Sequence, residues 1–306
     1  MGAVKQVVGV SVGSSSRDHV VEVELLGEAV RIRREGTDGS IPRAIERIRE
    51  LDGSVDAFGL GGIDVYLHAA GRDYRFRDAK RIAAAARLTP LVCGAGLKGA
   101  VEASTVRFMT DELGLALAGK RVLMTSAVDR YGLAEALYGA GCDMRYGDLL
   151  YVLGLPILLK SWRALNANIR TLAPIAVQLP FAWLYPIGDK QDAERTDHRH
   201  QGMYRDADVI AGDWQYVRKY MPEDMAGKWV VTNTTTPGDV EFLRDRGIEL
   251  LVTSTPRLAG RSFGTNVIEA TMVALKGASA PLRAREYAEL LATVGFVPDV
   301  QWLQRA

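Results

Sequence analysis

The chain has 306 residues, a net charge of +1, 48% hydrophobic and 25% charged residues, which favours two domains or one large domain of an ordinary globular protein. The near-zero charge excludes a general attraction to nucleic acid or acidic membranes, and the most apolar region, 149–186, is interrupted by charges and prolines before reaching the ~18 residues of a membrane span. Only Cys93 and Cys142 occur, without a C-x-x-C spacing, so we expect a cytoplasmic protein with no disulfide framework and no metal site.

The first third of the chain predicts a compact α/β domain. Strands are expected at 6–12, 19–26, 29–34, 55–60 and 89–93, and helices at 40–50, 78–87 and from Lys98 to about 112. Ser40 can cap the first helix, and Pro42 suits its first turn. The first three strands are expected to form a meander, an order similar to the start of ribonuclease-H-like and actin-like domains. We place the end of this domain, an N-terminal α/β domain spanning 1–117, in the connector before Lys120.

Residues 119–148 predict a strand–helix–strand unit of a dinucleotide-binding fold. An apolar strand at 120–125 is followed by a polar loop, a helix at 133–138 and a second strand at 142–146, with Asp148 after it. In such units a pyrophosphate lies at the helix N-terminus, and the acid binds a ribose. The expected G-x-G-x-x-G is absent, because the loop contains the single glycine Gly132.

The remaining chain alternates between strands and helices. Strands are expected at 208–211, 229–233 and 249–253, and helices at 161–172, 214–220, 237–246, 263–276 and 281–294. With 119–148, this pattern indicates an α/β protein whose second domain, 118–306, is Rossmann-like, with a doubly wound parallel sheet and C-terminal helices.

Candidate cofactor-binding residues follow the strands of this second sheet, because ligands bind beyond the carboxyl ends of parallel strands. They are Ser126, Ala127, Asp129, Arg130 and Gly132 in the turn, Asp148 after the second strand, and Asn233, Thr234 and Thr235 after a later one. Hydroxyl groups at helix starts suit phosphate or a polyhydroxylated ligand, although threonine is also an ordinary strand and cap residue. Asp129 would repel a pyrophosphate unless Arg130 offsets its charge.

Candidate substrate-binding residues lie at two other places. Arg257 and Arg261 could bind a carboxylate or phosphate as a fork, with Asn266 on the same rim. The polar loop Ser14, Ser15 and Ser16 follows the first strand. In each case an ordinary solvated surface is the alternative.

Lys98 is the candidate catalytic residue. It follows a strand and a Gly-Ala-Gly loop and begins a helix, where the macrodipole disfavours a cation. A lysine in such a place can act as general acid–base toward a hydroxyl or carbonyl group, although an exposed surface lysine is the alternative. Asp64, after Gly61-Gly62, is its candidate partner.

Three stretches give the chain a resemblance to the quinate/shikimate 5-dehydrogenase family. The segment 8–16 (VGVSVGSSS) is similar to that family's serine-bearing first strand, 91–102 (LVCGAGLKGAVE) to its catalytic-lysine helix, and 119–127 (GKRVLMTSA) to the entry into its cofactor domain. The resemblance implies a two-domain dehydrogenase with Lys98 as the catalytic lysine. The chain departs from the family in lacking the glycine-rich turn and the asparagine–threonine–aspartate motif.

These observations predict an NAD(P)-dependent oxidoreductase that acts on a small polar, quinate- or shikimate-like hydroxy acid in a cleft between the domains. NAD is preferred over NADP if Asp148 binds the ribose. The alternatives are a non-redox group-transfer enzyme and a non-catalytic ligand-binding protein. The expected partner is a small-molecule substrate, with no nucleic acid and no membrane, and the apolar region 149–186 could supply a homodimer face.

Overall fold

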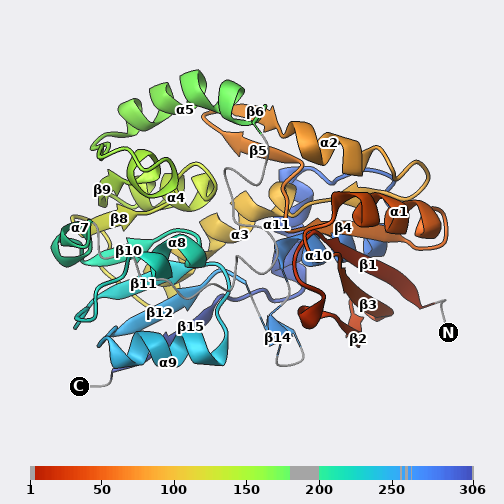
Figure 1. Ribbon diagram of the computed structural model, residues 1–306. Coiled ribbons are helices and arrows are strands. Elements are labelled where there is room, and N and C mark those ends of the chain that lie inside the picture. The colour runs from red at the N-terminus through yellow and green to blue at the C-terminus, as the bar shows by residue number, and fades with distance from the viewer. Residues whose placement is uncertain (1–3, 180–199, 256, 259–260, 263, 305–306) are drawn as a thin grey trace. The chain divides into compact units, whose positions relative to one another are not determined.

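The computed structural model describes residues 4–179, 200–255, 257–258, 261–262 and 264–304 (Figure 1). The chain divides into two compact units. The first unit falls within Met1–Ala100, Ala173–Ala193 and Phe263–Phe296, and the second within Val101–Leu172, Glu194–Ser262 and Val297–Ala306. This division differs from the predicted boundary after residue 117, because a C-terminal helical segment packs with the N-terminal sheet.

The first unit is built on a five-stranded sheet. Its strands are β1 (Lys5–Ser11), β2 (His19–Leu25), β3 (Glu28–Gly36), β4 (Ala57–Gly61) and β7 (Leu91–Val92), in the order β2-β3-β1-β4-β7. β2 and β3 form an antiparallel hairpin, whereas β1 pairs in parallel with both β3 and β4. The predicted meander is therefore wrong. Leu26 and Gly27, both with positive φ, form the hairpin turn, and β3 rather than β2 lies beside β1.

Helix α10 (Thr265–Lys276) packs against β1 and β4. Glycines make this close approach feasible: a β-carbon on Gly59 would lie 2.6 Å from the Asn266 carbonyl oxygen, and one on Gly9 would lie 2.9 Å from Val267. Because neither glycine has a side chain, the helix backbone reaches the strands. These contacts assign α10 to the first unit.

The other helices and strands described in the first unit include α1 (Ile41–Leu51), the hairpin β5 (Tyr66–Ala69) and β6 (Arg72–Arg75), α2 (Arg77–Ala83), the start of α3 (Ala95–Arg107) and α11 (Ala284–Thr293). The helices among them follow the predicted ones closely. The Ser40 hydroxyl accepts a hydrogen bond from the Arg43 amide, so the predicted cap of α1 is confirmed. The hairpin was not predicted, since its polar, charged sequence resembles a loop.

The second unit contains a six-stranded sheet with the order β15-β12-β11-β10-β8-β9. Its strands are β8 (Arg121–Met124), β9 (Asp143–Tyr146), β10 (Val209–Ala211), β11 (Trp229–Thr232), β12 (Leu250–Thr253) and β15 (Asp299–Trp302). The first five are parallel, and β15 is antiparallel to β12. If the parallel strands are numbered by their order in the chain, they lie side by side in the order 2-1-3-4-5, which is a doubly wound arrangement. Ligands of such sheets bind at the switch point of the strand order, which here lies between β8 and β10. The predicted α/β fold class is confirmed.

One face of this sheet carries a continuous apolar row. Leu123, Ile210, Val230 and Leu251 are register neighbours across four strands, and all are fully or almost fully buried in one core cluster. The helices that contribute to this cluster are α7 (Gly202–Asp206), α8 (Trp214–Lys219) and α9 (Pro237–Asp245). The row fixes the register, and therefore which residues reach the carboxyl end of each strand.

The remaining parts of the second unit include α4 (Tyr131–Gly139), the hairpin β13 (Arg257–Leu258) and β14 (Arg261–Ser262), and π-helical segments at Phe108–Glu112 and Asp148–Val152. Helix α5 (Trp162–Ala176) extends beyond its predicted end at 172. Within the described residues, no helix has both the length and the hydropathy needed to cross a bilayer.

Candidate functional site

Predicted site residues gather at two places, which we name by their sheets. The first edge is the carboxyl end of β1, β3, β4 and β7 with the segments that follow these strands. The second edge is the corresponding end of β8, β10, β11 and β12. Each edge is described within its own unit.

Lys98 and Asp64 meet at the first edge. The Lys98 Nζ lies 3.2 Å from the Asp64 Oδ2, and the two side chains are 14% and 25% exposed. Asp64 follows β4, and Lys98 stands in the first turn of α3, after β7. The carboxylate compensates for the unfavourable position of a cation near a helix N-terminus. A lysine paired with a carboxylate near a sheet edge can exchange a proton with a ligand.

The predicted serines form a turn of their own at the first edge. The hydroxyls of Ser14 and Ser16 lie 2.8 Å apart, and the Ser15 amide donates to Asp38 Oδ1 at 2.6 Å. Ser15 and Ser16 are exposed, so their hydroxyl groups remain accessible to a ligand. Asn266 lies in the first turn of α10, where its Nδ2 donates to the Gly59 carbonyl oxygen at 3.2 Å.

A buried carboxylate, Glu269, holds the turn before Lys98. Its oxygens accept hydrogen bonds from the Gly94 amide at 2.5 Å and from the Tyr287 hydroxyl at 2.5 Å. Burial raises the pKa of Glu269 to about 7, and these hydrogen bonds offset only part of the shift.

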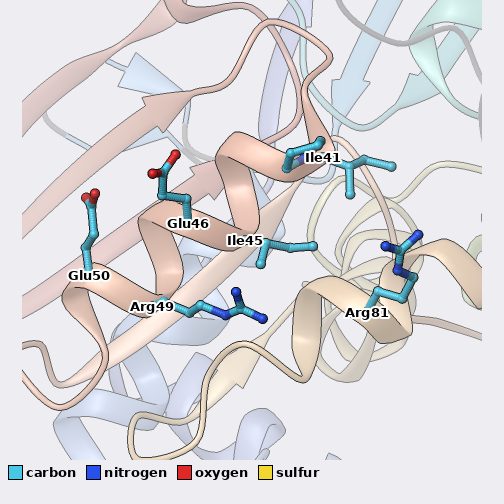
Figure 2. Close-up of a pocket in the computed structure, with 7 residues that line it drawn as sticks. Ile41, Ile45, Glu46, Arg49, Glu50 and Arg81 are labelled. Atoms are coloured by element: carbon cyan, nitrogen blue, oxygen red, sulfur yellow. The ribbon is translucent and has the colours of Figure 1, made fainter.

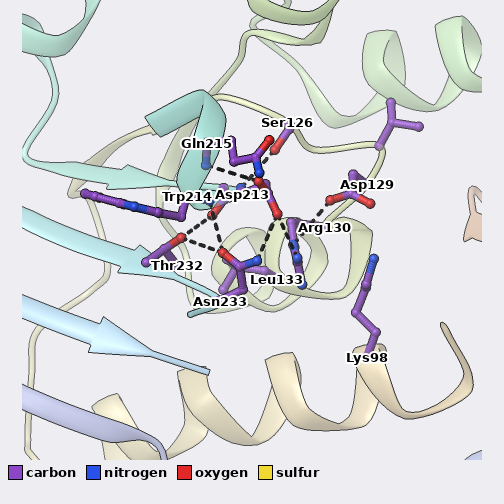
Figure 3. Close-up of polar contacts among 12 residues, drawn as sticks. Lys98, Ser126, Asp129, Arg130, Leu133, Asp213, Trp214, Gln215, Thr232 and Asn233 are labelled. Carbon is purple, nitrogen blue, oxygen red and sulfur yellow. Dashed lines mark hydrogen bonds and ion pairs between the residues drawn. The ribbon is translucent and has the colours of Figure 1, made fainter. Parts of the chain in front are cut away.

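At the second edge, Asp213 is the centre of a polar network (Figure 3). Its amide donates to the Ser126 hydroxyl at 3.0 Å, and its Oδ2 accepts from Asn233 Nδ2 at 2.9 Å. Asn233 Oδ1 in turn accepts from the Trp214 amide and the Thr232 hydroxyl, each at 3.0 Å. The network joins the ends of β8, β10 and β11 at the switch point, where an aspartate, an asparagine and hydroxyl groups could bind the hydroxyl groups of a ligand.

Arg130 is buried at the second edge among three carboxylates. Its guanidinium nitrogens lie 2.9 Å from Asp213, 3.3 Å from Asp129 and 3.4 Å from Glu102. Burial alone would lower the pKa of Arg130, but the charges of Asp129, Asp213 and Glu102 outweigh it and raise that pKa. Arg130 therefore offsets the charge of Asp129 through a direct ion pair and is engaged within the protein.

Two of the chain's own carboxylates occupy the turn where a pyrophosphate was expected. Asp148 Oδ1 accepts from the Val128 amide at 2.8 Å, and Glu102 Oε2 accepts from the Leu133 amide in the first turn of α4 at 2.9 Å. Both side chains are buried. These are the backbone donors that a dinucleotide phosphate uses in this fold. The turn therefore does not fit a pyrophosphate, and the Asp148 carboxylate is engaged by the backbone of the turn; its predicted contact with a ribose stays a prediction.

The buried Asp148 should make stability depend on pH. Burial raises the pKa of Asp148 from 3.8 to about 6, despite the hydrogen bonds from Val128 and Ala127. Between about pH 4 and pH 6 the folded chain therefore binds a proton that the unfolded chain has released. The contribution of Asp148 to the free energy of unfolding is largest below about pH 4 and is lost as the pH rises through 6. A shift of about two pKa units corresponds to about 3 kcal/mol.

Asp148→Asn should remove this dependence, because an amide does not titrate. We expect the difference in unfolding free energy between pH 4 and pH 7, measured by urea titration, to shrink in the variant. Asp245→Asn, on an exposed position of α9, is the control and should behave as the wild type. A variant with the wild-type pH dependence would contradict the assignment.

The other predicted residues lie as follows. Thr234 Oγ1 is 3.3 Å from Thr255 Oγ1, Thr235 is buried, Ala127 is fully buried, and Gly132 is the second residue of α4. Arg257 and Arg261 belong to the β13–β14 hairpin, where Arg257 pairs with Ser262 and Leu258 with Arg261; their side chains lie outside the described part. They are in the second unit and Asn266 is in the first, and their common rim stays a prediction.

A pocket of about 810 Å³ lies between α1 and α2 (Figure 2), and none of the predicted site residues lines it. Ile45 and Arg49 from α1 and Arg81 from α2 line it. Among the residues that the structure describes, His, Cys, Asp and Glu side chains form no group of three or more that could hold a metal ion.

Three acids at the two edges were not predicted as site residues: Glu102 and Glu269, which are buried, and Asp213, which is half-buried. Glu269 could have been found from its position as the one acid in the apolar helix 265–276, since a lone charge on a buried face needs a partner. Asp213 follows a strand and precedes a helix, the pattern of an N-cap, and its carboxylate does accept from the Gln215 amide. Glu102 carries no comparable local signal.

Solved structures that are similar to this chain include dehydrogenases and a sugar-binding protein. The hetero-hexameric glutamate dehydrogenase of Thermus thermophilus is 14% identical over 96% of this chain and 74% of that one, with a TM-score of 0.45. An NAD-dependent malic enzyme of Thermotoga maritima is 12% identical over 95% and 84%, with a TM-score of 0.40. GanP, a glucose-galactose binding protein of Geobacillus stearothermophilus, is 10% identical over 99% and 98%, with a TM-score of 0.38. At these values the likenesses carry no inference about activity or ligand.

No curated protein sequence matches the chain. Family models cover most of its length: one described as domain of unknown function DUF8753 matches residues 6–93, and one described as domain of unknown function DUF8754 matches residues 96–303. The second match spans more than half of the sequence, and the chain therefore belongs to the DUF8754 family.

Proposed function

We propose that this chain is an enzyme in which Lys98 and Asp64 exchange a proton with a hydroxyl or carbonyl group of a small polar substrate. The single observation that carries the proposal is the Lys98–Asp64 contact of 3.2 Å between two largely buried side chains at the first edge. A partly exposed ion pair adds little to stability, whereas a titratable side chain held at a sheet edge is placed to exchange a proton with a bound ligand.

The chemistry assigned to the pair is general acid–base catalysis. The Lys98 ammonium donates a proton to a developing alkoxide, and in the reverse direction the neutral amine accepts the proton of a substrate hydroxyl group. Asp64 balances the charge of the ammonium and orients its Nζ. The exposed hydroxyls of Ser15 and Ser16 at the same edge suit a hydroxylated substrate.

The geometry favours a non-redox reaction over the NAD(P)-dependent oxidation expected from the sequence. Asp148 and Glu102 already accept from the amides of Val128 and Leu133, and the one positive charge of Arg130 is shared among three carboxylates, Asp129 included. Oxidation of a small hydroxy acid with NAD or NADP is the second candidate. The 2-1-3-4-5 strand order, with polar residues at its switch point, favours it.

Calorimetric titration and a substrate panel test both candidates. The wild type is titrated with NAD, NADP and a neutral polyol, and it is incubated in deuterated buffer with small hydroxy acids, quinate and shikimate among them, while NMR follows turnover and exchange of carbon-bound hydrogens. The non-redox proposal expects turnover or exchange without nicotinamide and no binding of NAD or NADP at millimolar concentration. Nicotinamide binding with turnover that depends on it would replace it by the second candidate, and a panel without any turnover or exchange would refute both.

A further inference from the structure

Helix α10 buries an acid in otherwise apolar surroundings. Glu269 is 1% exposed, and its neighbours in the helix from Val267 to Ala274 are also buried. An ionised carboxylate in such a place is costly unless hydrogen-bonded groups compensate for its lost hydration. The partners of Glu269 therefore indicate what the acid does.

The turn before α3 is shaped around this carboxylate. Gly94 has a positive φ of +90°, and a β-carbon on Gly96 would lie 2.5 Å from Glu269 Oε1. The amides of Gly94 and Gly96 both donate to the carboxylate. Tyr287 of α11 donates its hydroxyl to Oε1 and accepts from the Leu282 amide at 3.1 Å. Three segments of the first unit thus converge on one acid.

The same residue of the turn, Gly94, also hydrogen-bonds to Lys98. While the Gly94 amide donates to Glu269, the Gly94 carbonyl oxygen accepts from the Lys98 amide at 2.9 Å. A shift of the turn would therefore move the first turn of α3, and with it the Lys98 side chain relative to Asp64.

We propose that Glu269 is a positioning residue for the Lys98–Asp64 pair, which it holds in place through the backbone of the turn 94–96. The inference rests on the proposed function, since it concerns the pair to which proton transfer is assigned. Glu269 itself touches neither Lys98 nor the predicted substrate residues in the contacts described above, and so it acts through the turn.

Protonation gives this arrangement a pH dependence. Burial raises the pKa of Glu269 to about 7, and a protonated carboxyl group accepts fewer hydrogen bonds than a carboxylate. Below this pH we expect the hydrogen bonds between Glu269 and the amides of the turn 94–96 to weaken. The titratable groups that face Glu269 are Asp64, Tyr66, Cys93 and Tyr287.

The test measures Lys98 directly and needs no substrate. The wild type and Glu269→Gln are labelled with trace acetic anhydride between pH 5 and pH 10, and the acetylation of Lys98 is measured by mass spectrometry relative to the exposed Lys80 of α2. In the wild type we expect a step near pH 7 in addition to the titration of Lys98. In Glu269→Gln the step should disappear, and the ratio of Lys98 to Lys80 should change by about 3- to 10-fold, as when one ordinary hydrogen bond is lost.

Two further variants make the outcome decisive. Tyr287→Phe removes one donor and keeps the carboxylate, so it should move the Lys98 profile in the same direction by a smaller factor; it also decides the question if Glu269→Gln does not fold. Glu289→Gln, on the exposed face of α11 where Glu289 pairs with Arg285, should leave the profile unchanged. A Lys98 profile that is the same in Glu269→Gln, Tyr287→Phe and wild type, even with a lower melting temperature, would overturn the inference without bearing on turnover.

Discussion

Replacing Lys98 by methionine should lower turnover by about 10²- to 10⁴-fold, the usual contribution of a positioned general acid–base. Methionine has a similar length and no proton to exchange. The fold should tolerate the change, because a partly exposed ion pair contributes only about 0–1 kcal/mol, and Asp64 at 25% exposure can be solvated when its partner is gone. The loss should therefore appear in kcat, while the dissociation constant of the ligand changes little.

The measurement is the initial rate for any compound of the panel that the wild type converts. Asp64→Asn keeps the amine but removes its charge partner, so it should lower kcat less and shift the pH profile of kcat. Lys80→Met, at an exposed position of α2, is the matched control and should retain wild-type rates. Turnover preserved in Lys98→Met would remove this residue from the mechanism and with it the acid–base proposal.

The strongest local signals in the sequence predicted the matching parts of the fold. Thr236 and Pro237 predict the start of a helix, and the structure contains a capping box between Thr236 and Asp239. The strand–helix–strand unit at 120–146 is found within a few residues of its predicted bounds. Apolar periodicity and cap chemistry are local properties, so a single sequence is sufficient to identify them.

Long-range packing was not predictable in the same way. Helix α10 follows the last parallel strand of the second sheet along the chain, and its contacts with β1 and β4, those at Gly9 and Gly59 among them, assign it to the first unit. The apolar pattern of residues 265–276 does not indicate which of the two sheets the helix covers. The predicted meander was wrong for a related reason, because pairing of β3 with β1 joins segments that are not consecutive.

The site residues show a similar division. The position of Asp64 after β4 and of Lys98 after β7 follows from element order, since parallel strands bring their carboxyl ends to one edge. The direction in which Asp148 points does not follow from order. An acid after the second strand is compatible both with a ribose contact and with a hydrogen bond to the turn, and only the structure shows that the buried Asp148 accepts from the Val128 amide.

Arg130→Met should lower the free energy of unfolding by about 3–5 kcal/mol, the cost of breaking a buried ion pair by removing one partner. The guanidinium is buried between Asp129, Asp213 and Glu102, and its loss leaves these carboxylates close together without it. The measurement is urea unfolding followed by circular dichroism. Arg285→Met removes an arginine that is 89% exposed and paired with Glu289, so it should change stability by less than about 0.5 kcal/mol.

A second substitution distinguishes charge repulsion from lost packing. If the destabilisation arises from unpaired carboxylates, Glu102→Gln in the Arg130→Met background should recover part of it, because one buried charge fewer remains. In the wild-type background the same substitution should destabilise, since Glu102 also accepts from the Leu133 amide at the start of α4. This change of sign in a double-mutant cycle requires that the residues interact. Additive effects of the two substitutions would instead mean that Arg130 fills space at the second edge and that its three carboxylates are stabilised independently of it.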